Sequence, residues 1–165
     1  MIQRTAILDG VRNRLETFFG AAGYRPLFRK TFRGKWQPGN TMRPAATVND
    51  DGSEKTGADN SDVTKNQRLK FQIILDLAEN FMRDGKDIRV DWSAELERIR
   101  MAVQNYDPKA GVLSMNVTND TPFDVVVQDG AIEPIWIIEC ECEFFIEFCE
   151  FGASEATMKA AVLAL

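Results

Sequence analysis

Hydrophobic side chains recur with helical spacing in two parts of the chain. Near the N-terminus they follow one another at intervals of three, four and one residues, which predicts an amphipathic helix that ends near Gly20 or Gly23. A second stripe predicts a helix after residue 91, with Asp91 or Ser93 as its N-cap, that ends before Pro108. We therefore expect two main helices.

Elsewhere apolar and polar residues alternate, as in strands with one buried face. The alternation is clearest over residues 69–77, and it also predicts a short strand at 45–48 and strands at 112–118 and 123–128, with a turn at 119–122. From 136 to 148 the even positions are apolar and most odd ones acidic, so we expect this strand to lie centrally in an antiparallel sheet.

These elements together predict an α+β fold: a mostly antiparallel sheet of about five strands flanked by two main helices. The 165 residues suit one domain, which we place at residues 1–152. Residues 49–66 are almost wholly polar and predict a long exposed loop between two strands. Residues 153–165 predict a short helix or a tail.

The residue types argue against catalysis. Histidine is absent, which removes the commonest general base and a frequent metal ligand, so we expect no enzyme. Cys140, Cys142 and Cys149 fall short of a tetrahedral zinc set and indicate reduced thiols in a core. The aspartates of the loop at 49–66 do not match an EF-hand. We expect no metal, no cofactor and, since no apolar run approaches the ~20 residues that span a bilayer, no membrane.

Charge is segregated along the chain. Between residues 17 and 49 there are six basic residues and no acid, whereas between residues 110 and 158 there are ten acids and no base. This pattern indicates two oppositely charged surfaces on one small body. Aromatic residues are interleaved with the basic stretch, so it could contact nucleic acid, but contact with an acidic surface of a neighbouring subunit is the favoured interpretation. The interface candidates are Arg29, Lys30, Arg33 and Lys35.

The glutamates of the last strand have two interpretations. They could form a solvated strand face, which is the ordinary outcome, or a functional electrostatic surface, since a row of like charges without nearby bases costs stability. On the second interpretation they would face a channel through which DNA slides without being held. The candidates are Glu139, Glu141, Glu143 and Glu147.

The order of elements resembles that of the tail terminator proteins of long-tailed bacteriophages. The N-terminal helix TAILDGVRNRLETFF leads to a short strand and polar loop, RPAATVNDDGSEKTG, then to a strand, RLKFQIILDLAE, a helix, WSAELERIRMAVQ, and a closing strand, WIIECECEFFIEF. The resemblance covers roughly residues 5–148. The basic insert at 25–43 and the segment SEATMKAAVLAL depart from the smallest members.

The resemblance implies a structural subunit that forms a hexameric ring on the end of the tail tube. Its partners would be other copies, the tail tube protein and the head-tail connector, with DNA passing through without specific binding. It would act in the virion after assembly in the host cytoplasm. Candidates for contact with tube or connector are Asp50, Asp51, Glu54, Lys55 and Asp59. Two alternatives stay open: another phage neck or tail-completion protein, and a small non-enzymatic acidic binding module.

Overall fold

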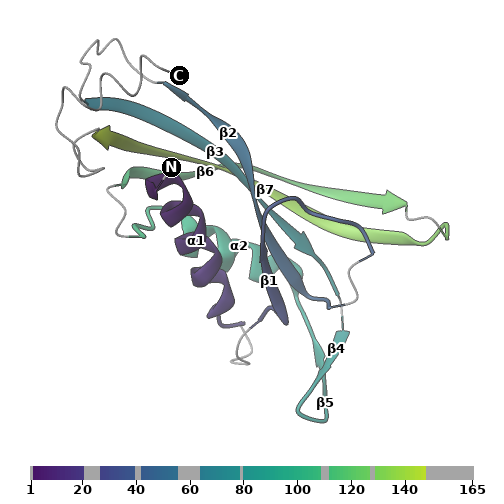
Figure 1. The fold of residues 1–165 in the computed structure, drawn as a ribbon. Coiled ribbons are helices and arrows are strands. Elements are labelled where there is room, and N and C mark those ends of the chain that lie inside the picture. Colours follow the sequence, from purple (N-terminus) through teal and green to yellow (C-terminus); the bar gives the residue numbers. More distant parts are fainter. Residues whose placement is uncertain are drawn as a thin grey trace.

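The computed structural model describes residues 2–20, 27–39, 42–55, 64–78, 80–108, 112–126 and 129–147. It contains two helices, α1 (Ile2–Glu16) and α2 (Trp92–Val103). The strands are β1 (Lys30–Arg33), β2 (Ala45–Lys55), β3 (Thr64–Asp76), β4 (Asn80–Arg83), β5 (Lys86–Arg89), β6 (Val112–Val126) and β7 (Ile132–Glu147). The α+β prediction is confirmed (Figure 1).

Five strands form one twisted sheet in the order β1-β2-β3-β7-β6, and β4 and β5 form a separate hairpin. All pairs of the large sheet are antiparallel except β1 with β2, which are parallel. The longest strand, β7, lies between β3, which pairs with residues 135–147, and β6, which pairs with residues 132–144, so the central position that its pattern predicted is confirmed. The two edge strands, β1 and β6, are far apart in the sequence.

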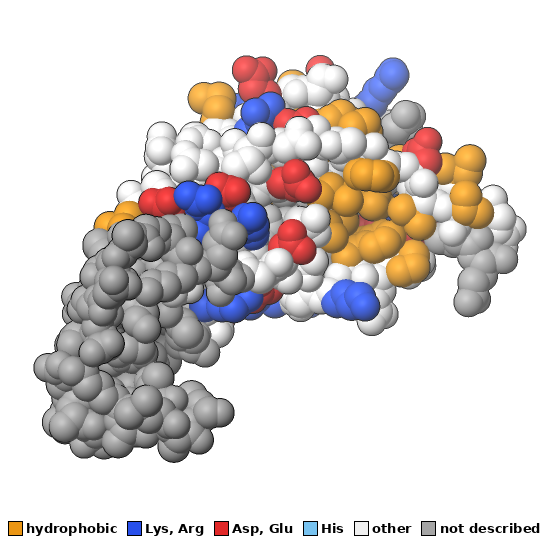
Figure 2. Space-filling model, turned by 90° about the horizontal axis from the view of Figure 1, so that it is seen from above, with side chains coloured by type: hydrophobic (Ala, Val, Ile, Leu, Met, Phe, Trp, Pro, Cys, Tyr) orange, Lys and Arg blue, Asp and Glu red, His pale blue; other side chains and the backbone are white. Residues whose placement is uncertain are grey.

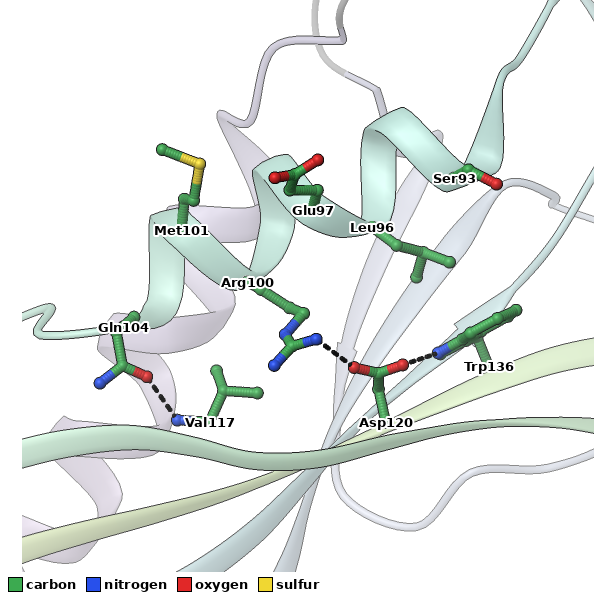
Figure 3. A pocket seen from close by; sticks show the side chains of 9 residues that line it. All are labelled: Ser93, Leu96, Glu97, Arg100, Met101, Gln104, Val117, Asp120 and Trp136. Carbon is green, nitrogen blue, oxygen red and sulfur yellow. Dashed lines mark hydrogen bonds and ion pairs between the residues drawn. The ribbon is translucent and has the colours of Figure 1, made fainter.

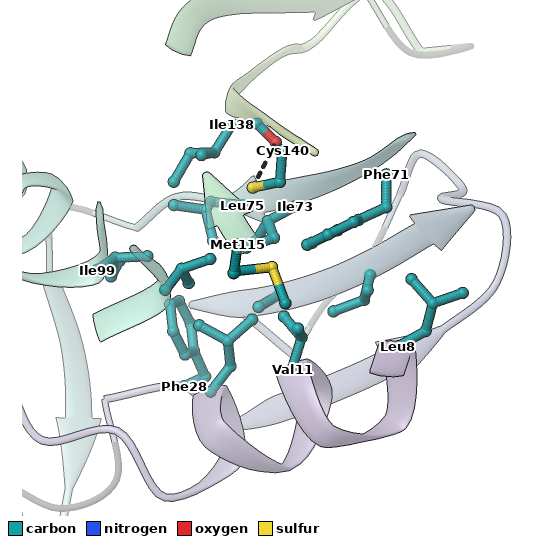
Figure 4. Packing of buried hydrophobic residues seen from close by; sticks show 14 of the residues in the cluster. Leu8, Val11, Phe28, Phe71, Ile73, Leu75, Ile99, Met115, Ile138 and Cys140 are labelled. Atoms are coloured by element: carbon teal, nitrogen blue, oxygen red, sulfur yellow. Dashed lines mark hydrogen bonds between the residues drawn. The ribbon is translucent and has the colours of Figure 1, made fainter. Parts of the chain in front are cut away.

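Both helices cover the same face of the sheet, called here the helix face (Figure 1). In Figure 4, Phe71, Ile73 and Leu75 of β3 surround a core that Leu8 and Val11 of α1 enter from the other side. In the middle of β7, the even-numbered residues Ile138, Cys140, Cys142 and Phe144 lie on this face and are buried. Burial of so many aliphatic and aromatic groups is the main stabilising contribution to such a domain.

The cap of α2 is the predicted one. Asp91 has extended backbone angles, and its Oδ1 accepts a hydrogen bond from the Ala94 N–H at 3.4 Å, so it satisfies one of the free donors of the first turn. Helix α1, by contrast, ends at Glu16, a few residues before the predicted end at Gly20 or Gly23. Sequence patterns locate helix ends only to within a few residues.

Three sequence predictions differ from the structure. Strands β2 and β3 extend into the polar stretch at 49–66, so the connection between them is shorter than the predicted loop. Residues 112–126 form one strand where two strands and a turn were predicted. The hairpin of β4 and β5, whose turn residues Asp84 and Gly85 both have positive φ, was not predicted. Residues 153–165 lie outside the described part of the chain.

The thiols of Cys140 and Cys142 are core groups. Burial, with a smaller contribution from Glu139, raises the pKa of Cys140 from its ordinary value of 9.0 to about 12. Burial, followed by Asp107 and Glu143, raises the pKa of Cys142 to about 12 as well. Both thiols are free and protonated at neutral pH.

We therefore expect both thiols to resist iodoacetamide in the native protein at pH 8 and to react fully in denaturant, because the thiolate is the nucleophile. Folding raises both thiol pKa values, so the unfolded chain loses these protons at lower pH than the folded chain. The two thiols therefore leave the free energy of unfolding unchanged below the unfolded pKa near 9.0 and lower it increasingly as the pH rises toward 12. Mass spectrometry of a Cys149→Ser chain measures the labelling. Rapid native labelling would show that the sheet opens more readily than this core permits.

Candidate assembly surfaces

The basic stretch of the sequence forms one edge of the sheet. Strand β1 is the edge strand beside β2, and Arg29, Lys30 and Lys35, in or next to it, are exposed. Arg33 differs, because its Nε lies 2.9 Å from Oδ1 of Asp9 in α1 and its Nη1 donates to the Val48 carbonyl at 3.2 Å. Of the four interface candidates, three are therefore available to a partner and Arg33 is engaged within the chain.

The first part of the acidic stretch forms the opposite edge. Strand β6 is the edge strand beside β7, and it carries Asp120 and Asp124 but no base. The turn beyond it adds Asp129, whose Oδ1 accepts the Ala131 N–H at 2.9 Å. Two regions of opposite charge, about 80 residues apart in sequence, thus lie at the two ends of one five-stranded sheet.

The β6 edge is protected against pairing with another strand. The Met115 carbonyl accepts the Asn105 N–H at 2.9 Å, and the Val117 N–H donates to Oε1 of Gln104 at 2.9 Å, so the end of α2 occupies two outward-facing backbone groups. Beyond the irregularity between Val117 and Asn119, the same outward orientation falls to Asp120 and Pro122. Proline has no N–H to offer there, and a charged residue disfavours strand addition. A partner at this edge would meet side chains, not a free backbone ladder.

A groove of about 570 Å³ lies between α2 and the β6–β7 pair, as Figure 3 shows. Asp120 joins its two walls: one carboxylate oxygen is 2.7 Å from Nη1 of Arg100, and the other accepts the Trp136 Nε1–H at 3.2 Å. Met101, at the rim, is 72% exposed. The groove was missed in the sequence because its residues come from α2, β6 and β7, which local patterns do not bring together.

The face of the sheet opposite the helices, called here the open face, carries the predicted glutamates Glu139, Glu141 and Glu143. Their basic neighbours come from β3, which the sequence prediction overlooked. Nη2 of Arg68 lies 3.1 Å from Oε1 of Glu143, and its Nε lies 3.8 Å from Glu141. Lys70 is the cross-strand partner of Glu141. The expectation that these carboxylates lack nearby bases was therefore wrong, because it considered β7 and β6 but not the strand on the other side.

A shallow hollow of about 270 Å³ opens on this face, lined by Asp51, Lys70, Thr118, Glu139 and Glu141 among others. Acids outnumber bases there, so the local charge remains negative in spite of β3. The backbone of Glu147 belongs to the end of β7, and its side chain lies outside the described part. The open face is thus a weakly acidic, polar surface.

A strap, residues 34–39 and 42–44, crosses the other end of the open face. The Trp36 Nε1–H lies 3.0 Å from both carboxylate oxygens of the fully buried Asp76. Glu133 binds the strap twice, through Nη2 of Arg43 at 2.6 Å and through the Gly39 N–H at 3.0 Å. Figure 2 shows the molecule from above. On this face, hydrophobic side chains gather toward the right end, and a group of Lys, Arg, Asp and Glu side chains lies nearer the left end. The basic insert therefore contacts acids within its own chain through Arg43.

The candidates for contact with a tube or connector lie mostly within β2. Asp50 is bound to Nε of Arg4 at 2.6 Å and accepts the Gly52 N–H at 2.9 Å. Burial raises its pKa, but these two hydrogen bonds together with the positive charges of Arg4 and Arg33 outweigh burial and leave the pKa of Asp50 below its ordinary value. Asp51 is exposed, Glu54 and Lys55 belong to the β2 backbone, and Asp59 lies outside the described residues.

Over the described ranges, no group of three or more Cys, Asp or Glu side chains is arranged to hold a metal ion. Within the same ranges no helix is both long and apolar enough to cross a membrane. The sequence matches no protein-family model and no curated protein. What the arrangement offers chemically is electrostatic: a basic edge, an acidic edge protected from strand pairing, and a polar open face.

Proposed function

We propose that this chain is the tail terminator of a long-tailed bacteriophage, a structural subunit that forms a ring on the end of the tail tube and joins it to the head connector. The observation that carries the proposal is the position of the two charged regions at opposite edges of one sheet. The order of elements, which resembles the terminator family, gives the proposal its specific form.

Opposite edges suit a ring because a head-to-tail contact requires two different, complementary surfaces on every subunit. A symmetric dimer would instead place like charges together. Arg29, Lys30 and Lys35 at one edge and Asp124 and Asp129 at the other are exposed and provide such a pair of surfaces, whereas Asp120 is engaged by Arg100 and Trp136 within the chain. Because the β6 edge is protected, neighbouring subunits would meet there through side chains. Strand-to-strand pairing, which could add subunit after subunit without closing a ring, is disfavoured.

The open face is proposed to face the DNA channel. Its glutamates are partly balanced by Arg68 and Lys70, so it is only weakly acidic. Such a wall neither attracts phosphates strongly nor repels them at long range, since the screening length is about 8 Å at physiological salt. DNA would pass without the counterion release that holds it on a basic surface. Tube and connector would then contact the two rims of the ring.

Negative-stain electron microscopy and native mass spectrometry of the purified chain, alone and mixed with tail tubes, test the proposal. We expect rings of uniform size, seated on tube ends in the mixture. Addition to tubes that are still elongating should also stop their growth. Small compact particles that neither form rings nor bind tubes would reject the proposal in favour of an acidic binding module.

Reversing charge at the basic edge should weaken the ring without unfolding the subunit. In the double variant Arg29→Glu with Lys30→Glu, both side chains are exposed, so the fold should persist. The variant should form rings only at about tenfold higher protein concentration, and its defect should shrink in high salt. The matched control is Arg89→Glu, which reverses the charge of an exposed side chain on β5. Normal ring formation by the double variant at physiological salt would show that this edge is not the interface.

A further inference from the structure

A second groove, of about 530 Å³, lies between the end of α1 and the outer side of α2. Apolar groups form part of its lining: Phe18, Phe19, which is 44% exposed, and Met101, which is 72% exposed. Its two charged lining residues, Arg14 and Arg98, are both basic. We call it the arginine groove.

Both guanidinium groups are held by backbone, not by carboxylates. Nε of Arg14 donates to the Ala102 carbonyl at 2.9 Å, and its guanidinium lies 4.6 Å from the centre of the Tyr106 ring. Arg98 donates to the Phe19 carbonyl at 3.4 Å. Neither forms an ion pair with any residue in the described part of the chain, so their full charge remains available to an acidic partner.

The tip of the β6–β7 hairpin has the complementary character. Val126 and Ile132 are cross-strand partners, and they are 71% and 64% exposed. Asp124 and Asp129, both exposed, flank them, and no Lys or Arg occurs between residues 110 and 158. We call this group the acidic knob. In Figure 1 the hairpin projects away from both helices, which places knob and arginine groove on different sides of one subunit.

We infer that the acidic knob of one copy docks in the arginine groove of the next copy. Val126 and Ile132 would cover Phe19 and Met101, while the two aspartates would approach the two arginines. The match combines apolar burial with opposite charge, which gives both affinity and orientation. Because knob and groove lie on different sides of each subunit, the contact is head-to-tail and repeats around a ring. The inference rests on the proposed ring and names one of its contacts.

The first test removes the knob. Val126→Ser with Ile132→Ser changes only exposed side chains, so thermal unfolding should be nearly unchanged. Sedimentation velocity should show rings dissociating at about tenfold higher concentration or more than in the unaltered chain. Met82→Ser is the matched control, because Met82 is 60% exposed on the β4–β5 hairpin and outside both surfaces. Unchanged dissociation of the double variant would overturn the inference.

The second test exchanges charge. Arg98→Glu should weaken the ring to a similar extent, and Asp124→Arg in the same chain should restore it in part, because the exchange re-creates an opposite-charge pair across the contact. The control is Lys86→Glu, which reverses the charge of an exposed side chain on β5. An Arg98→Glu chain that Asp124→Arg worsens would contradict the contact.

Cross-linking gives a direct measurement. A chain with Ile132→Cys is mixed with a chain with Met101→Cys, each also carrying Cys149→Ser, and the mixture is oxidised. Since each chain holds one half of the contact, a disulfide-linked pair can form only between copies. A mixture of Met82→Cys with Met101→Cys should remain unlinked.

The outcomes separate this inference from the proposed function. Rings without the Ile132–Met101 cross-link would overturn the knob contact and leave the terminator proposal standing. Cross-linked fibres or pairs that never close into rings would support the contact and reject the ring. A chain that stays monomeric and unlinked at every concentration would overturn both.

Discussion

Replacement of Phe71 by alanine is expected to lower the free energy of unfolding by about 4 kcal/mol, the typical cost of removing a buried phenylalanine. Phe71 is 1% exposed and lies on β3, the middle strand of the sheet, in the core cluster to which both helices contribute (Figure 4). Domains of this size are stable by only about 5–15 kcal/mol, so the variant should lose a large fraction of its stability and unfold at a clearly lower urea concentration.

Gln72→Ala, one position further along β3 and on the open face, is the matched control and should cost less than about 1 kcal/mol. Urea unfolding followed by tryptophan fluorescence measures both variants. If Phe71→Ala lost no more stability than Gln72→Ala, the helix face would not be the principal core.

Replacement of Glu133 by alanine is expected to cost about 2 kcal/mol and to loosen the strap. Its carboxylate side chain is only 10% exposed and binds both Arg43 and the Gly39 N–H. The variant would leave the guanidinium of Arg43 largely buried, and its Nε already has no hydrogen-bond partner. Leaving one member of a buried pair uncompensated is costly, although partial exposure of Arg43, at 24%, reduces the loss.

Glu139→Ala removes an exposed carboxylate from the same strand and face, so its cost should stay below about 0.5 kcal/mol. Hydrogen exchange should show faster exchange in residues 34–39 of the Glu133→Ala chain. Adding Arg43→Met to Glu133→Leu should recover most of the lost stability, because an apolar pair needs no charge compensation. No recovery would mean that the strap is held by contacts other than this pair.

The strands with one buried face were predictable from the sequence. Over residues 69–77 and 136–148, alternate hydrophobic positions predict one buried side, and in the described part, at 69–75 and 138–144, these groups do lie on the helix face. Residues 50–55 gave no such pattern because β2 has few apolar residues there. Their pairing with β3 depends on the partner strand, which local sequence does not reveal.

The single strand β6 shows the same limitation. Asn119, Asp120, Thr121 and Pro122 favour a turn locally, and the prediction of a turn followed from that preference. In the structure these residues pair with β7 throughout, and Pro122 falls at an outward position where its missing N–H does no harm. Long-range pairing outweighed local preference.

The candidate surfaces depended on strand order, which the pattern of residues does not contain. Two oppositely charged surfaces were predictable from the segregation of charge, but their location at opposite edges was not. Arg68 and Glu143 are 75 residues apart in sequence and 3.1 Å apart in space. A prediction made from neighbouring sequence could not have paired them.

The irregularity between Val117 and Asn119 has a consequence for how this gene can change. One extra residue there reverses the side-chain phase, so that odd positions from Met115 to Val117 and even positions from Asp120 onward belong to the helix face. Insertion or deletion of a single codon elsewhere in β6 would turn the intervening residues over, sending Met115 or Asp120 to the wrong face. An insertion in this strand should therefore be tolerated only together with a nearby deletion that restores the phase. The bulge itself can shift along the strand only across residues that are acceptable on both faces.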